Sequence, residues 1–147
     1  MTLLKKKTYK FLIIGANGLL GNEFKRILKK KNFLSVARNN ADININLKNF
    51  YELKKIFYNH KFNFVINCAA ITNLVECENN KLQCKLVNSY LPKKLTGLSI
   101  INNFKYIHIS TDHLFRNKKF ALNKETKKIE KINYYSQSKI IAEKYVE

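Results

Sequence analysis

Short apolar runs alternate along this chain with longer stretches in which apolar residues recur at helical spacing. The apolar runs predict buried strands at residues 9–14, 33–37, 62–67 and 104–110. Helical spacing predicts helices over 19–31, over 50–58, over about 75–100 and from 134 to the end. The third of these is expected in two pieces, because it contains Pro92 and the polar run Glu78-Asn79-Asn80. Strands separated by helices imply right-handed βαβ units. The sequence therefore predicts an α/β fold with a doubly wound parallel sheet.

Three glycines follow the first predicted strand at regular spacing, at positions 15, 18 and 21. Glycine permits a tight strand-to-helix turn, lets the backbone approach a pyrophosphate, and allows close helix–strand packing. The spacing indicates a Rossmann-like dinucleotide-binding turn. Alone it is a weak signal, because glycine triplets also occur by chance.

Two further motifs carry side-chain chemistry. Tyr135 and Lys139 are four residues apart, so they lie on one face of a predicted helix. A phenol is a poor acid or base at neutral pH, and a nearby ammonium favours its ionised form. Thr111 follows the fourth strand, at the carboxyl edge where doubly wound sheets bind ligands. Tyr–Lys pairs are common on surface helices, but together with the glycine turn they favour a nucleotide-dependent oxidoreductase.

The amino-acid composition bears on whether the protein binds nucleic acid, binds metal or enters a membrane. The formal net charge is +18, yet only three of the 28 basic residues are Arg (Arg26, Arg38 and Arg116), and direct base readout favours Arg. We therefore interpret the charge as surface composition, and a basic nucleic-acid-binding module remains an alternative.

Cys68, Cys77 and Cys84 form no CxxC pair, and the histidines lack metal-ligand spacing, so reduced thiols and no metal are expected. The sequence shows no signal peptide or membrane-length apolar run, which predicts a cytoplasmic protein.

In their order along the chain, these motifs resemble the extended short-chain dehydrogenase/reductases, and among them most closely the dTDP-4-dehydrorhamnose reductase family. The resemblance covers about residues 10–147. The positions that support the closer match are Val65 to Thr72, Glu76, Glu78, Asn88, Ser110-Thr111-Asp112, Phe115, Glu125 and Asn133. His113 and Ser136 depart from the family pattern, which usually has Tyr and Gly there, and Lys127 and Lys131 stand where Asp and Pro are common.

The resemblance implies NAD(P)H-dependent reduction of the 4-keto group of a nucleotide-linked 6-deoxysugar, in deoxysugar and cell-surface polysaccharide synthesis. It would make Tyr135 the proton donor, Thr111 a hydrogen-bond donor to the keto oxygen, and Lys139 the group that tunes Tyr135 and holds the nicotinamide ribose. The implied cofactor-binding residues are Gly15, Asn17, Gly18, Leu19, Gly21, Arg38, Asp42, Ile43, Ala69, Ala70 and Thr72, together with Tyr135 and Lys139. The alternative for Asp42 is a structural carboxylate in a turn. Asn88 is expected to link its helix to the backbone of another segment rather than to contact a ligand.

Arg38 lies at the end of the second strand, where such folds choose between cofactors. An acidic residue there would accept a hydrogen bond from a ribose hydroxyl, whereas a guanidinium suits a 2′-phosphate. We expect NADPH as the cofactor, with NADH as the alternative.

The family also carries further strands and a C-terminal sugar-nucleotide domain, whereas this sequence stops inside the helix that bears Tyr135 and Lys139. We therefore expect residues 1–147 to form an incomplete Rossmann-like domain, truncated before the C-terminal strands and substrate domain, with its fourth strand as an open edge. Such a chain alone is expected to be inactive, with a second copy or a complementing C-terminal chain as its partner. A non-catalytic alternative is a regulatory member like the methionine adenosyltransferase regulatory subunit.

Overall fold

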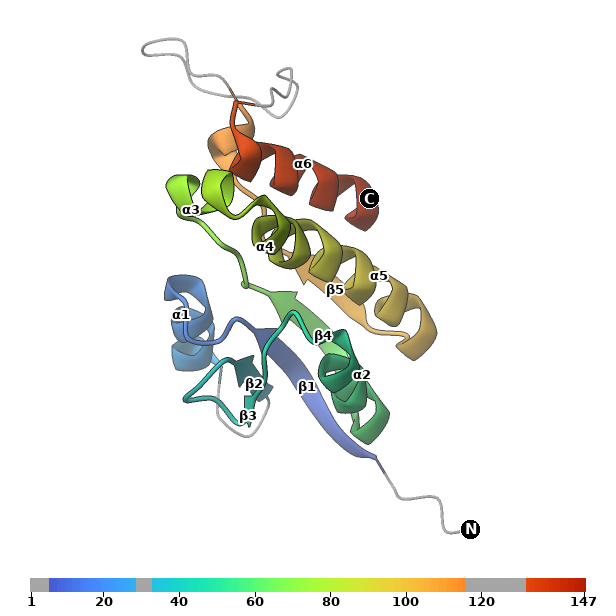
Figure 1. The fold of residues 1–147 in the computed structure, drawn as a ribbon. Helices are drawn as coiled ribbons and strands as arrows, with labels where there is room; N and C mark the ends of the chain where they lie inside the picture. The colour runs from blue at the N-terminus through green and yellow to red at the C-terminus, as the bar shows by residue number, and fades with distance from the viewer. Residues whose placement is uncertain (1–5, 29–32, 116–131) are drawn as a thin grey trace. The chain divides into compact units, whose positions relative to one another are not determined.

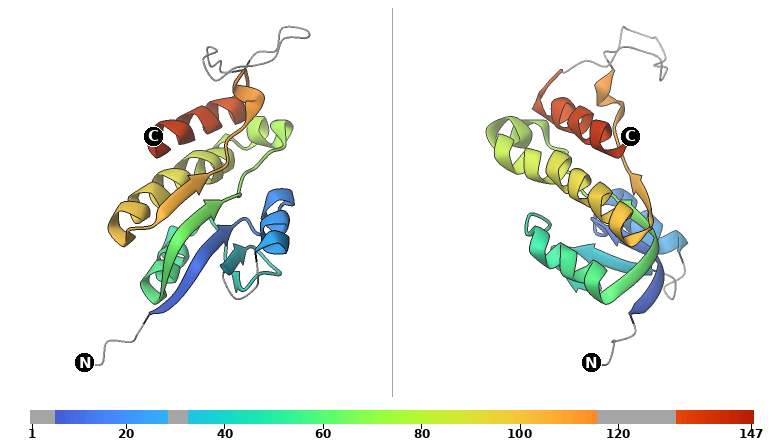
Figure 2. Two further views of the ribbon diagram at one scale, coloured as in Figure 1. Left: turned by 180° about the vertical axis from the view of Figure 1, so that it is seen from behind. Right: turned by 90° about the vertical axis from the view of Figure 1, so that its right-hand side faces the viewer.

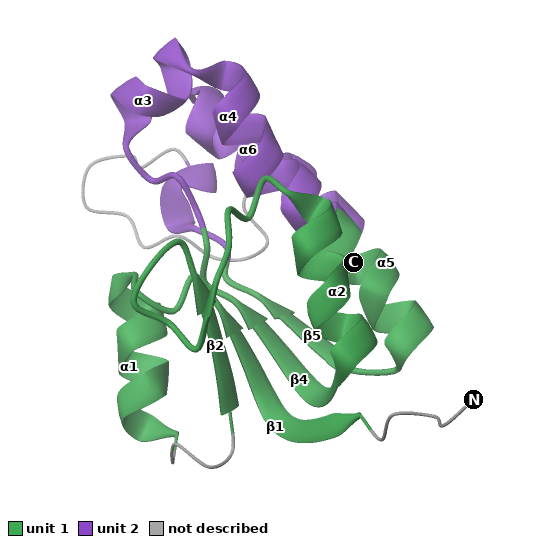
Figure 3. Ribbon diagram, turned by 60° about the horizontal axis from the view of Figure 1, so that its bottom comes forward, with its two compact units in different colours: residues 1–69, 94–109 green, residues 70–93, 110–147 purple. Residues whose placement is uncertain are grey.

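The computed structural model describes residues 6–28, 33–115 and 132–147 (Figure 1). The chain divides into two compact units, shown in separate colours in Figure 3. Unit 1 comprises Met1–Ala69 and Lys94–Ile109, and unit 2 comprises Ala70–Lys93 and Ser110–Glu147. The predicted charged loop over 116–131, with Glu125, lies outside the described residues.

Unit 1 is built on a five-stranded sheet in the order β3-β2-β1-β4-β5, in which every neighbouring pair is parallel. The strands are β1 (Lys7–Ile14), β2 (Phe33–Ala37), β3 (Ile43–Asn44), β4 (His60–Asn67) and β5 (Lys105–His108). The predicted parallel α/β sheet is therefore confirmed, and β5 forms the predicted edge of the described sheet. The sequence pattern missed β3, because two residues are too short to show alternation.

Helices cover both faces of this sheet, as Figure 2 shows. On one face α1 (Leu19–Ile27) packs Phe24 against Ile13 and Phe33. On the other face lies α2 (Phe50–Asn59), which buries Leu53, Ile56 and Phe57. The described part of α1 is shorter than the predicted 19–31, because Leu28 already has an extended backbone (φ −79°, ψ 131°).

Unit 2 is helical. Its elements are α3 (Leu74–Asn79), α4 (Lys81–Lys85), a π-helical turn (Leu86–Tyr90), the start of α5 (Leu91–Asn102), a 3-10 turn (Asp112–Leu114) and α6 (Tyr134–Val146). Of the two predicted interruptions of the helical region, the polar run Glu78-Asn79-Asn80 is confirmed, because α3 ends at Asn79 and α4 begins at Lys81. Pro92 does not break the helix, because it occupies the first turn of α5, where a missing N–H is tolerated. Within the described residues, every helix is too short or too polar to cross a membrane.

Candidate functional site

The glycine turn between β1 and α1 has no room for side chains at two of its three glycines. Gly15 has φ +78°, and a Cβ there would lie 2.6 Å from the backbone nitrogen of Ala69. A Cβ on Gly21 would lie 2.3 Å from the carbonyl oxygen of Gly15. Gly18 is less constrained: it is the N-cap of α1, and no side chain of the described residues caps this helix. The backbone N–H groups of the first turn of α1 are thus uncapped by side chains, which suits an anion such as pyrophosphate.

Asn17 links the glycine turn to the segment that follows β2. Its side-chain amide donates to the carbonyl oxygen of Asn39, the residue after Arg38. Its oxygen Oδ1 accepts a hydrogen bond from Lys25 Nζ at 3.1 Å. Arg38 itself is exposed. The structure thus places Asn17 next to the segment that contains Arg38. This proximity is needed if both residues are to contact the same cofactor.

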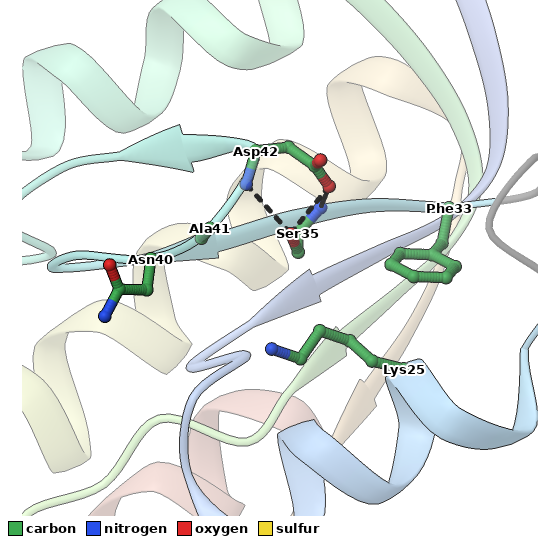
Figure 4. Close-up of a pocket in the computed structure, with 6 residues that line it drawn as sticks. All are labelled: Lys25, Phe33, Ser35, Asn40, Ala41 and Asp42. Carbon is green, nitrogen blue, oxygen red and sulfur yellow. Dashed lines mark hydrogen bonds between the residues drawn. The ribbon is translucent and has the colours of Figure 1, made fainter.

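Asp42 lies in a hollow of about 390 Å³ beside β2 (Figure 4). Its oxygen Oδ2 accepts hydrogen bonds from the backbone N–H (2.9 Å) and the hydroxyl (2.6 Å) of Ser35, and its own N–H donates to the Ser35 hydroxyl at 3.0 Å. The carboxylate therefore fastens the turn before β3 onto β2. The residues that line the hollow are Lys25, Phe33, Ser35, Asn40, Ala41 and Asp42.

The predicted site residues divide between the two units. Unit 1 holds Gly15, Asn17, Gly18, Leu19, Gly21, Arg38, Asp42, Ile43 and Ala69. Unit 2 holds Ala70, Thr72, Thr111, Tyr135 and Lys139. Within unit 1, Ala69 lies directly against Gly15. Within unit 2, the three candidate catalytic residues belong to the 3-10 turn and α6.

The beginning of α6 is fixed by polar contacts from two directions. Asn133 Oδ1 accepts from the N–H of Ser136 (2.8 Å), and Ser136 Oγ accepts from the N–H of Asn133 (3.1 Å), which together form a capping box. On α3, Glu78 accepts the N–H of Tyr134 at 2.7 Å. Ser136, a departure from the family pattern, therefore gives the helix a cap that glycine could not supply.

Tyr135 is buried, with 7% of its surface exposed, and packs with Cys77 and Cys84. The ring of His113, on the 3-10 turn, meets the Tyr135 ring edge-on, with 5.9 Å between centroids and 82° between planes. Thr111 caps that turn, because its Oγ1 accepts the N–H of His113 at 3.2 Å. This bond uses a lone pair of Thr111, so the hydroxyl hydrogen can still be donated to another acceptor.

Lys139, one helical turn beyond Tyr135, is 1% exposed. Burial lowers the pKa of its ammonium to about 8, and the carboxylate of Glu143, a further turn along α6, acts in the opposite direction. Glu143 also accepts a hydrogen bond from the hydroxyl of Ser110. Glu143 is not among the residues predicted from sequence, although its spacing of four residues from Lys139 is a signal that could have revealed it.

Asn88, on the π-helical turn, brackets the chain after β4 as expected. Its Oδ1 accepts from the N–H of Ile71 at 2.8 Å, and its Nδ2 donates to the carbonyl of the same residue at 2.9 Å. The nearby Cys77 and Cys84 thiols lie 2.7 Å apart, Sγ to Sγ, and are free thiols. Burial raises the pKa of Cys77 to about 12, so this thiol is poorly suited to act as a nucleophile.

Comparison with known proteins places these features in a family context. The chain matches the family described as the RmlD substrate binding domain over residues 9–147. It is 26% identical over 141 residues to a dTDP-4-keto-6-deoxy-D-glucose reductase of Streptomyces niveus, covering 95% of this chain and 48% of that protein. It is 30% identical over 135 residues to a dTDP-4-dehydrorhamnose reductase of Burkholderia thailandensis, covering 91% and 44%.

Solved structures show the same similarity. A dTDP-4-dehydrorhamnose reductase from Clostridium acetobutylicum superposes with a TM-score of 0.82 and 31% identity, covering 93% of this chain and 48% of that one. A reductase of the same name from Bacillus anthracis, solved in complex with NADP, shares the fold with a TM-score of 0.82 at 22% identity and covers 99% and 50%. The chain spans about half the length of the relatives it matches.

Proposed function

Because the chain belongs to the RmlD substrate binding domain family, we propose that it forms the cofactor-binding and proton-donating half of an NADPH-dependent nucleotide-sugar reductase. The family resemblance found in the sequence is thereby confirmed. The observation that carries the proposal is the buried Tyr135–Lys139 pair on α6, in a chain whose β1 ends in a glycine turn without room for side chains. Retention of Thr111 beside this pair favours a reductase over a purely regulatory protein.

The proposed reaction reduces the C4 keto group of a nucleotide-linked 6-deoxysugar to an alcohol. The bound dinucleotide supplies the hydride that adds to C4. Tyr135 gives its phenolic proton to the keto oxygen, and the Thr111 hydroxyl donates a hydrogen bond to the same oxygen. The Lys139 ammonium holds the cofactor ribose and favours the ionised form of the phenol that proton transfer leaves behind.

The proposed cofactor site fits the residues of the glycine turn. Gly15, Gly18 and Gly21 would lie against the pyrophosphate, where a Cβ on the first or third would collide with backbone. The exposed guanidinium of Arg38 would bind the 2′-phosphate of NADPH, with NADH as the weaker alternative. Asp42 and Ile43 would border the adenine, and Ala69, Ala70 and Thr72 would line the middle of the cofactor. Since Oδ2 of Asp42 is engaged by Ser35, that carboxylate shapes the turn as well.

The relatives' names support a biosynthetic role. They include a probable low-salt glycan biosynthesis reductase from Haloferax volcanii and a spore coat polysaccharide biosynthesis protein from Bacillus subtilis. We therefore assign the chain to cytoplasmic deoxysugar and polysaccharide synthesis. Because it spans about half of its relatives, reductase activity is proposed to require the remaining half, in the same polypeptide or in a complementing one.

A binding experiment tests this function on residues 1–147. NADPH and NADH are titrated by nicotinamide fluorescence against the parent chain and against Arg38→Asp. The parent is expected to prefer NADPH, and the substitution should weaken NADPH binding by about 10- to 150-fold, the equivalent of a lost charge-assisted bond. Arg26→Asp is the control, because Arg26 is an exposed α1 residue paired with Glu23. Absence of binding by either nucleotide would refute the proposed function, and an unchanged preference would refute the role of Arg38.

A further inference from the structure

The two segments of unit 2 that carry the proposed chemistry are joined through one side chain, Glu143. Tyr135, Lys139 and Glu143 follow one another at intervals of four residues, so they form one stripe of α6. Across from this stripe, the Ser110 hydroxyl donates a hydrogen bond to Glu143 Oε1. Ser110 immediately precedes Thr111. Glu143 therefore connects the segment that bears Thr111 to the helix that bears the other two residues.

We propose that Glu143 is a positioning residue of the reductase site, which fixes Thr111 relative to α6 through Ser110 and places a negative charge one helical turn from the Lys139 side chain. The inference rests on the proposed function, because it takes Thr111, Tyr135 and Lys139 to be the catalytic residues. It assigns Glu143 no contact with substrate or cofactor.

The hydrogen bond has a mechanical role. Thr111 begins the 3-10 turn, whose His113 ring meets the Tyr135 ring edge-on. This ring contact is an aromatic pair of modest energy. The Ser110–Glu143 bond adds a second attachment on the other side of Thr111. Two attachments that flank one residue restrict it far more than either alone, which is what a hydrogen-bond donor to a developing oxyanion needs.

The charge has a separate role. Lys139 is almost fully buried, and burial favours the neutral amine. Glu143 opposes this effect, so that the pKa remains at about 8 and the ammonium predominates at neutral pH. A neutral amine would lose its electrostatic attraction for an ionised phenol. The titratable groups on the elements around α6 are Glu76, Cys77 and Glu78 on α3, Lys81, Cys84 and Lys85 on α4, the exposed Tyr90 on the π-helical turn, and Asp112 and His113 on the 3-10 turn. Among these, Cys77 and Cys84 pack against Tyr135, and Glu78 accepts a hydrogen bond from the N–H of Tyr134.

Three variants separate the two roles. Glu143→Gln removes the charge but keeps an oxygen that can accept from Ser110. Ser110→Ala removes the hydrogen bond but keeps the charge. Glu143→Ala removes both. Glu147→Gln is the matched control, because it neutralises an exposed acidic side chain at the same end of the helix.

NMR on residues 1–147 provides both readouts without any need for turnover. The Lys139 side-chain signal, assigned with Lys139→Arg, is titrated with pH, and the His113–Tyr135 ring contact is followed by its nuclear Overhauser effect. We expect the Lys139 midpoint to fall below that of the parent in Glu143→Gln and Glu143→Ala, and to stay near the parent value in Ser110→Ala and Glu147→Gln. The ring contact should weaken in Ser110→Ala and Glu143→Ala and persist in Glu143→Gln.

An unchanged Lys139 midpoint in Glu143→Gln would overturn the electrostatic role, and an unchanged ring contact in Ser110→Ala and Glu143→Ala would overturn the mechanical one. Failure of the proposed function is seen separately, because it appears as loss of nucleotide binding in the parent chain and leaves both NMR readouts intact.

Discussion

The two units offer different kinds of surface to a ligand. In unit 1 the candidate site consists mainly of backbone, and its geometry depends on the absence of side chains at Gly15 and Gly21. In unit 2 it consists of side chains: Tyr135 packs against residues of α3 and α4, and Glu78 on α3 accepts a hydrogen bond from the N–H of the neighbouring Tyr134. A backbone site can be encoded by a few consecutive residues, whereas a side-chain site needs partners that are distant in sequence. Substitutions should therefore act through steric collision in unit 1 and through polarity and charge in unit 2.

The largest expected effect tests the side-chain chemistry of unit 2. In a hybrid that joins this chain to the C-terminal half of the Burkholderia thailandensis reductase, Tyr135→Phe should lower turnover by roughly 10²–10⁴-fold, because the proton donor is lost. NADPH affinity should remain nearly unchanged. Stopped-flow oxidation of NADPH with a nucleotide-linked 4-ketosugar measures both.

Tyr134→Phe is the matched control for that experiment, since it removes the neighbouring hydroxyl from the same helical turn. It should leave turnover within a few-fold of the parent. Near-normal turnover of Tyr135→Phe would contradict the proton-transfer role.

The steric character of unit 1 is tested by Gly21→Ala. The new methyl group would lie 2.3 Å from the Gly15 oxygen and 2.7 Å from the Ala16 Cα, both backbone atoms that cannot rotate away. We expect the free energy of unfolding to fall by roughly 3 kcal/mol, the upper end of overpacking effects. Urea unfolding followed by circular dichroism measures it. A loss below about 0.5 kcal/mol would show that the turn relaxes easily and that its tight packing is not required.

The electrostatic character of unit 2 predicts a gain in stability from Lys139→Met. With its pKa lowered from 10.5 to about 8, the folded chain holds a charge in an unfavourable place at neutral pH. Removing that charge should raise the free energy of unfolding by on the order of 2–3 kcal/mol at pH 7, while cofactor binding falls. Lys144→Met, on an exposed position of α6, should change little.

The same variant carries a pH signature. Between pH 8 and about 10.5, the unfolded parent keeps a Lys139 proton that the folded parent has released, so the burial penalty fades as pH rises. The stability difference between Lys139→Met and the parent should therefore narrow over this range, and other titrating groups cancel in the difference. A variant less stable than the parent at pH 7 would show that packing of the lysine outweighs its charge.

The smallest expected effect completes the comparison of glycines. Gly97 lies in α5, and a Cβ there would meet no atom within 4 Å. Gly97→Ala should therefore raise the free energy of unfolding by about 0.5–1 kcal/mol, because alanine restricts the unfolded chain and favours helix. Comparing the unfolding free energies of Gly97→Ala and Gly21→Ala separates two effects. Gly97→Ala reports the replacement of a glycine alone, and Gly21→Ala adds the steric collision of the new methyl group. Destabilisation by Gly97→Ala would reveal a contact at that position.

The sequence allowed the parallel sheet, the glycine turn and the Tyr135–Lys139 helix to be predicted, because each depends on spacing within a short segment. It did not reveal β3, whose two residues are held beside β2 by the Asp42–Ser35 bonds rather than by an apolar pattern. The polar run that ends at Asn80 correctly marked the interruption between α3 and α4, whereas Pro92 was a false signal, because proline is a strong breaker only beyond the first helical turn. The Ser110–Glu143 bond joins residues that no local pattern connects. The roles of the proposed cofactor and catalytic residues remain predictions.

The π-helical turn Leu86–Tyr90 has a consequence for how this family can change its length during evolution. A π-helical turn contains one residue more than the corresponding α-helical turn. In this chain the wider turn presents the consecutive residues Asn88 and Ser89 to Ser138, through bonds of 3.1 Å and 2.8 Å. A single-residue deletion there would restore a regular helix, but it would rotate the preceding residues by about 100° around the axis and separate Asn88 from Ile71. Insertions and deletions should therefore be selected against in this segment even where individual side chains can vary.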